Sequence, residues 1–255
     1  MDDKRSARLG EIRKAIAANE FFLEYLPTVV LKDGRCAGAE ALIRWRHDGR
    51  IIPPMEFIPF VENTPLAGLL TYWVIEQVGR DVGSWLRHQT SSVHMGINVP
   101  PELLGRGGIE YAELKSKLRG LSHKLILEVS ERGVIARLGL QDLNERVGHG
   151  SLIALDDVQL REVSSMLLAR VKVDIIKLDK AVTDTLTDDP ASEPARTVKA
   201  LASVPGLAII AEGVETKEQA LLLAQLGVEY AQGFYFSRPV SADAFKAYFA
   251  AHNHE

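Results

Sequence analysis

The sequence contains one cysteine, Cys36, and no apolar run long enough to cross a membrane. A single cysteine excludes an intrachain disulfide and a metal site built from several thiolates. A membrane-spanning helix needs about 20 mostly apolar residues, and the charged N-terminus lacks the apolar core of a secretory signal. We therefore expect a cytoplasmic location and no membrane contact through this chain.

The sequence also has no large excess of positive or negative charge. The 30 Lys and Arg residues and 34 Asp and Glu residues give a formal net charge of -4 over 255 residues. With 46% hydrophobic, 25% charged and 7% aromatic residues, the composition is typical of a globular protein. The chain has no overall basic field to hold a nucleic-acid polymer, so an anionic ligand would need local cations.

Short β-rich runs alternate with helical patterns along the chain. The candidate strands are residues 22–31, 39–45, 94–99, 125–130, 152–157, 175–179, 208–212 and 230–236. Helical patterns cover residues 4–20, 66–86, 139–147 and 217–226. The short Asp33-Gly34 turn between the first two runs predicts a hairpin, so these two strands should be antiparallel.

Strands that are mostly joined by helices favour an α/β fold, a modified TIM-type (β/α)8 barrel with an antiparallel start. An open doubly wound sheet is the alternative. No linker or shift in composition divides the chain, so we expect a single barrel domain over residues 1–255. Its parts would be an N-terminal helix in 1–20, barrel strands in 22–236, and a C-terminal helix and tail in 237–255.

Acidic and amide residues follow the apolar runs where the candidate strands end. They are Asn98, Glu128, Asp156, Asp157 and Glu212, and Lys177 lies in a similar position. Glu40, Leu42 and Arg44 share one face of their strand because side chains alternate with a period of two. In a barrel these positions meet at one mouth, where catalytic groups gather.

Five carboxylates at one mouth require neutralisation. Two like charges about 4 Å apart repel by about 4 kcal/mol at an effective dielectric of 20. Lys177 and Arg44 offset two charges at most, which leaves divalent cations for the rest. Oxygen ligands favour Mg²⁺ or Mn²⁺ over zinc, and the adjacent Asp156 and Asp157 can divide two ions. A single strand-end acid is more often a helix cap or a surface ion pair, but five acids from four different strands favour a metal site.

Several short motifs follow one another along nearly the whole chain. They are Glu40-Ala41-Leu42-Ile43-Arg44, Pro53-Pro54 with Phe57-Ile58-Pro59, Ile97-Asn98-Val99-Pro100, Leu127-Glu128-Val129-Ser130-Glu131, Asp156-Asp157, Val173-Asp174 with Lys177-Leu178-Asp179, Ala211-Glu212-Gly213-Val214-Glu215-Thr216, and Gln232-Gly233 with Phe236-Ser237-Arg238-Pro239. In this order and spacing they resemble the EAL domains, phosphodiesterases that hydrolyse the bacterial messenger cyclic di-GMP to linear pGpG.

The resemblance implies a role for each matching residue. The metal ligands would be Glu40, Asn98, Glu128 and Asp156, with Asp156 and Asp157 serving a second ion. Glu212 would be the general base or a further ligand, and Lys177 would orient the attacking water. Arg44, Gln232 and Pro239 would contact the substrate, whereas Glu131 and Glu215 would support loops. The resemblance also implies two Mg²⁺ or Mn²⁺ ions and a homodimer.

The chain departs from the family pattern in two places. After Asp157 it reads Val158-Gln159-Leu160-Arg161-Glu162-Val163, without the two glycines of the usual loop and the backbone freedom they allow. Leu26 stands where a glutamine is usual before Pro27. The alternative function is therefore a non-catalytic cyclic di-GMP receptor or protein-interaction module. An enolase-like barrel acting on a carboxylate substrate is a third possibility, against which the motif spacing argues.

Overall fold

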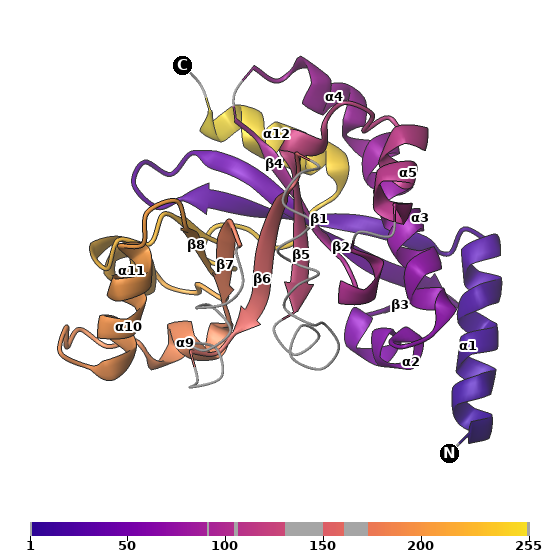
Figure 1. The fold of residues 1–255 in the computed structure, drawn as a ribbon, viewed down its shortest axis with the longest axis horizontal. Helices are drawn as coiled ribbons and strands as arrows, with labels where there is room; N and C mark the ends of the chain where they lie inside the picture. The colour runs from indigo at the N-terminus through magenta and orange to yellow at the C-terminus, as the bar shows by residue number, and fades with distance from the viewer. Residues whose placement is uncertain (1, 91, 105–106, 131–149, 161–172, 254–255) are drawn as a thin grey trace.

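The computed structural model describes residues 2–90, 92–104, 107–130, 150–160 and 173–253, and Figure 1 shows their arrangement. Within these residues the strands form one sheet. The strands are β1 (Phe21–Val30), β2 (Cys36–His47), β3 (Arg50–Ile52), β4 (His94–Asn98), β5 (Leu125–Ser130), β6 (Leu152–Val158), β7 (Ile175–Leu178), β8 (Ala208–Ala211) and β9 (Tyr230–Ala231).

The sheet closes on itself. Its order is β1-β9-β8-β7-β6-β5-β4-β2-β3, and β1 also pairs with β2. The ring is therefore a barrel made by β1, β2 and β4 to β9, and β3 extends β2 outside it. β1 is antiparallel to both β2 and β9, whereas the pairings from β2 through β4 to β9 are parallel. This confirms the predicted barrel with an antiparallel start, and ring closure excludes the open sheet.

Three sequence predictions need correction. The short strand β3 was not expected, because its three residues carry no long apolar run. The pattern over 66–86 forms two helices, α3 (Pro65–Asp81) and α4 (Gly83–His88), since the backbone at Val82 leaves the helical region at φ -128° and ψ -9°. The last strand covers Tyr230–Ala231 rather than 230–236, because beyond it the chain turns back and Tyr235 N–H donates to the carbonyl of Val214. The predicted helix over 139–147 lies outside the described residues.

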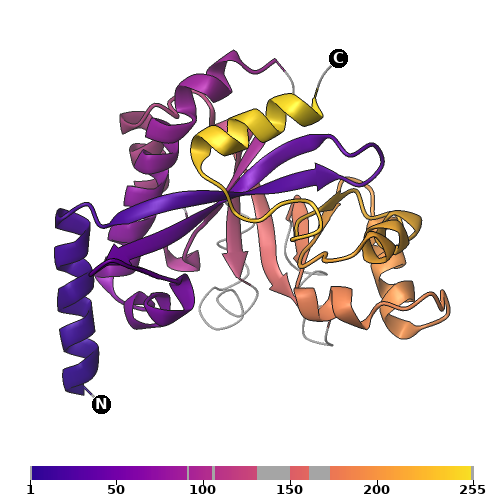
Figure 2. The ribbon, with the colours of Figure 1, turned by 180° about the vertical axis from the view of Figure 1, so that it is seen from behind.

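Helices surround the barrel. They are α1 (Asp2–Ala17), η1 (Pro54–Glu56), α2 (Ile58–Val61), η2 (Pro101–Leu103), α5 (Gly108–Lys115), η3 (Ser122–Lys124), α9 (Lys180–Thr185), α10 (Glu193–Ala202), α11 (Lys217–Gln225) and α12 (Ala242–His252). Figure 2 shows α12 lying across the β1–β2 hairpin, where the rings of Tyr25 and Phe245 stack with centroids 5.9 Å apart. No helix within the described ranges is long and apolar enough to cross a membrane.

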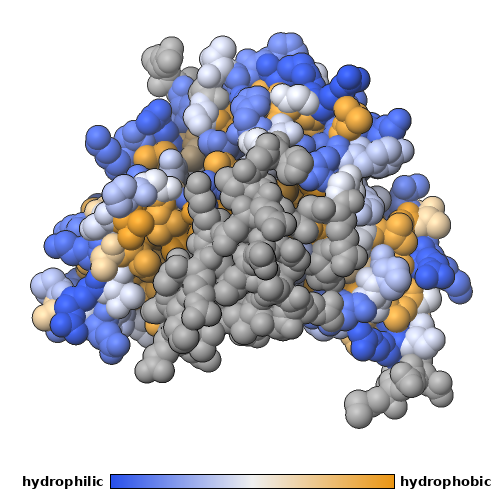
Figure 3. Space-filling model, viewed as in Figure 1, coloured by the Kyte–Doolittle hydropathy of each residue, from blue (hydrophilic) through white to orange (hydrophobic). Residues whose placement is uncertain are grey.

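The main apolar core lies between the barrel wall and the surrounding helices, and a second cluster lies beneath α1. In this second cluster Ile12 of α1 packs with Phe21, Trp45 and Phe57, and the guanidinium of Arg8 lies 4.6 Å from the centroid of the Trp45 ring. On the face shown in Figure 3, hydrophilic side chains cover most of the outer rim and hydrophobic ones emerge in separate patches. The barrel strands are thus held from outside by apolar packing against the helices.

Strand alternation decides which side chains face the inside of the barrel. In the β1–β2 hairpin Leu26 lies opposite Glu40 and Thr28 lies opposite Gly38. The neighbouring residues Tyr25 and Ala41 are buried in the outer core. Because successive side chains point to opposite faces of a strand, Glu40 projects inward.

Candidate active site

The amino group of Lys177, on β7, lies at the centre of a cluster of carboxylates. Its side chain is 1% exposed, and carboxylates from β2, β5, β6 and the end of β8 reach its Nζ atom. The distances from Nζ are 3.1 Å to Glu40, 2.8 Å to Glu128, 3.1 Å to Asp156 and 2.7 Å to Glu212. The sequence predicted that these residues meet, and the structure brings them together around one lysine.

The register of the parallel strands explains this convergence. Glu40 is level with Gly96 on β4, and Asn98 is level with Glu128 on β5. Gly96 has no side chain, and a Cβ atom at this position would overlap the carboxylate of Glu128. The absence of a side chain on β4 therefore makes room for the Glu128 carboxylate beside Glu40, a role that the sequence did not reveal.

The exposure of the carboxylates rises from the floor of the cluster toward solvent. The Glu128 side chain is 2% exposed, that of Asp156 is 12% and that of Glu212 is 22%. Lys177 and Glu128 therefore form the floor, and Glu212 is the most exposed of the four carboxylates that contact Lys177.

Burial and mutual repulsion change the acidity of these groups. Desolvation and the nearby Glu40 raise the pKa of Glu128 well above its ordinary value, although Lys177 opposes this. Desolvation, Asp156 and Glu40 likewise raise the pKa of Glu212 to about 7, again against the effect of Lys177. Burial alone would lower the pKa of Lys177, but the surrounding carboxylates together raise it well above its ordinary value. The lysine thus stays charged, and some of the acids retain protons at neutral pH.

The donor set fits divalent cations. One carboxylate oxygen from each of Asp156, Asp157 and Glu212 lies within 4.8 Å of the others. Oδ1 of Asp156 is buried and forms no hydrogen bond among the described residues, so its contact there is the ion pair with Nζ of Lys177 at 3.1 Å. Asn98 joins the carboxylates around Lys177 through Glu40, because its side-chain amide donates to Oε1 of Glu40 at 2.8 Å. Such clustered oxygen donors suit hard ions of the Mg²⁺ and Mn²⁺ type.

An open cleft of about 850 Å³ leads to the cluster. Glu40, Asn98, Glu128, Asp156 and Asp157 line its inner part. Its apolar wall comes from α2, α3 and the residues around them, and includes Met55, Ile58, Pro59, Leu70 and Val74. Sites for small molecules usually measure about 300 to 1,000 Å³ and combine apolar walls with a few polar groups, as this cleft does.

The structure corrects the expected role of Arg44 in balancing charge. Nε of Arg44 pairs with Oε2 of Glu24 at 2.8 Å, so its charge offsets that of an acid on β1. Sequence reasoning missed Glu24, because the contact depends on the register of the hairpin, in which Glu24 lies opposite Leu42. Among the described groups that touch the carboxylate cluster, Lys177 supplies the positive charge.

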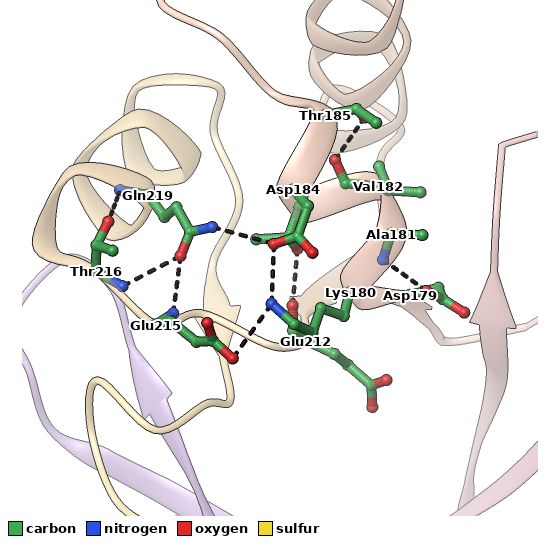
Figure 4. Close-up of polar contacts among 11 residues, drawn as sticks. Asp179, Lys180, Ala181, Val182, Asp184, Thr185, Glu212, Glu215, Thr216 and Gln219 are labelled. Atoms are coloured by element: carbon green, nitrogen blue, oxygen red, sulfur yellow. Dashed lines mark hydrogen bonds and ion pairs between the residues drawn. The ribbon is translucent and has the colours of Figure 1, made fainter.

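The remaining predicted residues lie outside the cluster. Gln232 is buried, and its Nε2 donates to the hydroxyl of Thr28 at 2.8 Å. Pro239 is partly buried and directly precedes Val240, which bridges to β1. Glu215 is exposed, and its carboxylate lies 3.3 Å from Nζ of Lys180 (Figure 4). Glu131 lies outside the described residues.

Comparison with known proteins gives consistent results. The EAL domain family model matches residues 9–239. The chain is 34% identical over 244 residues to the cyclic di-GMP phosphodiesterase PdeL of Escherichia coli K12, covering 92% of this chain and 66% of PdeL. It is 31% identical over 240 residues to the probable cyclic di-GMP phosphodiesterase PdeN of the same organism, covering 92% of this chain and 46% of PdeN.

Solved structures agree with these matches. The structure of the PaMucR phosphodiesterase in complex with c-di-GMP superposes with a TM-score of 0.81 and 29% identity, covering 94% of this chain and 99% of that one. The chain therefore spans about two thirds of PdeL and about half of PdeN, but nearly the whole of the PaMucR chain in that structure.

Proposed function

Because this chain belongs to the EAL domain family, we propose that it is a metal-dependent phosphodiesterase that hydrolyses cyclic di-GMP to linear pGpG. The observation that carries the proposal is the convergence of Glu40, Glu128, Asp156 and Glu212 on the buried amino group of Lys177 at the inner end of a large cleft. Acids and a lysine brought together from separate strands at one mouth are the arrangement in which barrel enzymes carry out catalysis.

The metal ligands in this proposal are Glu40, Asn98, Glu128, Asp156 and Asp157, with Mg²⁺ or Mn²⁺ as the ions and Asp156 and Asp157 serving the second of two. When bound, such ions lower the pKa of a coordinated water and neutralise the phosphoryl oxygens. The buried acceptor Oδ1 of Asp156 and the grouping of Asp156, Asp157 and Glu212 support this assignment.

Glu212 and Lys177 have complementary roles in the proposed reaction. A carboxylate with a pKa of about 7 can take a proton from water near neutral pH. Lys177 neutralises part of the cluster, holds the Glu212 carboxylate through its 2.7 Å contact, and would orient the attacking water. In the hydrolysis the water oxygen bonds to phosphorus, one P–O ester bond breaks, and the departing sugar oxygen receives a proton.

The substrate would occupy the cleft, with Arg44, Gln232 and Pro239 as contacts. Nη1 of Arg44 donates to the carbonyl of Ile43 and Nε pairs with Glu24, but a guanidinium has five donors and can also bind phosphate. Nε2 of Gln232 is bonded to Thr28, whereas its Oε1 accepts no hydrogen bond among the described residues. This oxygen supports a polar contact with the ligand.

Two loops bear on this proposal. We assign Glu215 to support the connection between β8 and α11, because its N–H is bound by Gln219 and its carboxylate pairs with Lys180 (Figure 4). The same role for Glu131 rests on the family motif. In the loop without glycines, Leu160 has a φ of 55°, a left-handed conformation that costs a non-glycine residue about 1 to 2 kcal/mol. A homodimer and a cytoplasmic location stay predictions.

The experiment is incubation of the purified chain with cyclic di-GMP and Mn²⁺, followed by chromatography of the products. We expect linear pGpG, no product with EDTA, and no product from a folded Glu40→Ala variant. Glu76→Ala is the matched control, because Glu76 pairs with Arg80 on the exposed side of α3. Binding of cyclic di-GMP without turnover would favour the receptor alternative, to which the strained loop points. If the chain shows no binding and no turnover, both functions are rejected.

A further inference from the structure

The backbone of Glu212 lies where the chain leaves the barrel. Its N–H donates to the carbonyl of Leu178 at 3.0 Å, which extends the β7–β8 pairing by one residue. The preceding carbonyl, that of Ala211, accepts from Gln232 N–H at 2.8 Å. After Glu212 the chain turns at Gly213, whose φ is 65°. The carbonyl of Glu212 thus lies beyond the regular ladder and needs a different donor.

Thr183 supplies that donor. It lies on α9, is 1% exposed, and its hydroxyl donates to the Glu212 carbonyl at 2.8 Å across a sequence separation of 29. A threonine inside a helix can bond a carbonyl of its own preceding turn. Thr185 on the same helix does so, since its hydroxyl donates to the carbonyl of Val182 at 2.8 Å (Figure 4). The Thr183 hydroxyl instead links α9 to the residue that follows β8.

The segment that carries β7 and α9 therefore holds Glu212 at both ends. Lys177 contacts the carboxylate at 2.7 Å, and Thr183 binds the carbonyl at 2.8 Å. The side chain of Lys180 covers the next peptide, because a Cβ atom on Gly213 would overlap it. In Figure 4 the carboxylate of Glu212 extends away from Lys180, Asp184 and Glu215, so these contacts restrain the backbone and leave the carboxylate to the site.

We infer that Thr183 is a positioning residue that fixes the peptide from which the Glu212 carboxylate projects. Lys177 restrains the carboxylate itself but cannot set the direction of the backbone behind it. An error of about 1 Å in placing a reacting group can lower a rate about a hundredfold, so a buried hydrogen bond at this point affects catalysis without touching the substrate. The inference rests on the proposed role of Glu212.

The test compares Thr183→Val, which removes the hydroxyl, with Thr183→Ser, which keeps it. We expect kcat for cyclic di-GMP to fall about tenfold in Thr183→Val, because a misplaced Glu212 carboxylate would slow the reaction step. KM should stay within about twofold, because an interaction that acts on the reaction step leaves binding unchanged. Thr183→Ser should retain most of the activity. Thr185→Val is the matched control and should behave like the unmodified protein, since the Thr185 hydroxyl donates to the carbonyl of Val182 within α9.

Hydrogen exchange measured by mass spectrometry gives a readout that needs no turnover. The peptide covering 211–216 should exchange faster in Thr183→Val than in Thr183→Ser or Thr185→Val. Unchanged exchange in this peptide overturns the inference, whatever the activity. If the unmodified protein shows no turnover, the proposed function fails, and exchange alone decides the role of Thr183. Thr183→Ala replaces Thr183→Val in the comparison if the valine variant does not fold.

Discussion

Replacing Lys177 by methionine tests whether one buried cation holds the carboxylate cluster together. Its Nζ lies 2.7 to 3.1 Å from the four carboxylates. At about 3 Å each such pair attracts by about 5 to 6 kcal/mol at an effective dielectric of 20. Desolvation of the charges and repulsion among the acids offset most of the sum, and loss of one partner of a buried ion pair typically costs about 3 to 5 kcal/mol.

For a domain of this size, each kcal/mol lowers the melting temperature by about 2 to 4 °C. Lys177→Met should therefore melt about 6 to 20 °C below the unmodified protein in EDTA at pH 8. The deficit should shrink at pH 5, where protons replace the missing positive charge on the acids. Added Mn²⁺ should stabilise the variant more than the unmodified protein, because the ion then meets less competition from the lysine.

The measurement is thermal unfolding followed by circular dichroism, with and without EDTA. Lys246→Met is the matched control, since Lys246 pairs with Asp243 on the surface of α12 and exposed pairs contribute about 0 to 1 kcal/mol. Equal melting temperatures for the two variants in EDTA at pH 8 would show that the cluster does not depend on Lys177, and the reasoning from its contacts would be refuted.

Further predictions concern protons, metal and packing at the same site. The folded protein raises the pKa of Glu212 from 4.5 to about 7, so the contribution of this group to stability is fully present below pH 4.5 and is lost as the pH rises through about 7. In Glu212→Gln the free energy of unfolding, measured with urea in EDTA, should therefore fall less between pH 5 and pH 8 than in the unmodified protein. Equal falls would contradict this. The raised pKa values of Glu128 and Glu212 leave protons in the cluster, so Mn²⁺ binding near pH 6 should release protons. Calorimetry in buffers of different ionisation enthalpy detects this release. Binding heats that do not depend on the buffer would argue against proton release. Gly96→Ala should push the Glu128 carboxylate aside and weaken Mn²⁺ binding at least about tenfold. Gly10 has open space around it, so the control variant Gly10→Ala should bind Mn²⁺ normally. Equal affinities of the two variants for Mn²⁺ would refute the role of Gly96.

Features that depend on local pattern could be predicted from the sequence. The apolar runs located the strands that carry Asn98, Glu128 and Asp156, and the Asp33-Gly34 turn identified the antiparallel hairpin. The barrel topology then implied that strand-end residues meet at one mouth. No further information was needed to expect Glu40, Lys177 and Glu212 in one cluster.

Features that depend on register or on a single backbone torsion could not be predicted. The pairing of Arg44 with Glu24 requires the relative shift of β1 and β2, and the hydrogen bond from Thr183 to Glu212 joins residues far apart in sequence. The break at Val82 interrupts an apolar pattern that continues through α4. Likewise, the aromatic run after Ala231 favours a strand, but the chain turns there because Val214 binds both Gln232 and Tyr235 through its backbone.

The graded burial of the cluster explains how one site can combine the permanent charge of Lys177 with a proton on Glu212 that exchanges with solvent. Lys177 and Glu128 lie at the floor, where exposure is 1% and 2%, so the charge of Lys177 is compensated within the protein and burial favours a proton on Glu128. Glu212 is the most exposed of the four carboxylates that contact Lys177, with 22% of its side chain exposed, and its pKa of about 7 lets it exchange a proton near neutral pH. Its backbone is held by the segment that also supplies the lysine. The proposed general base is therefore fixed in position while its protonation can change, as this role requires.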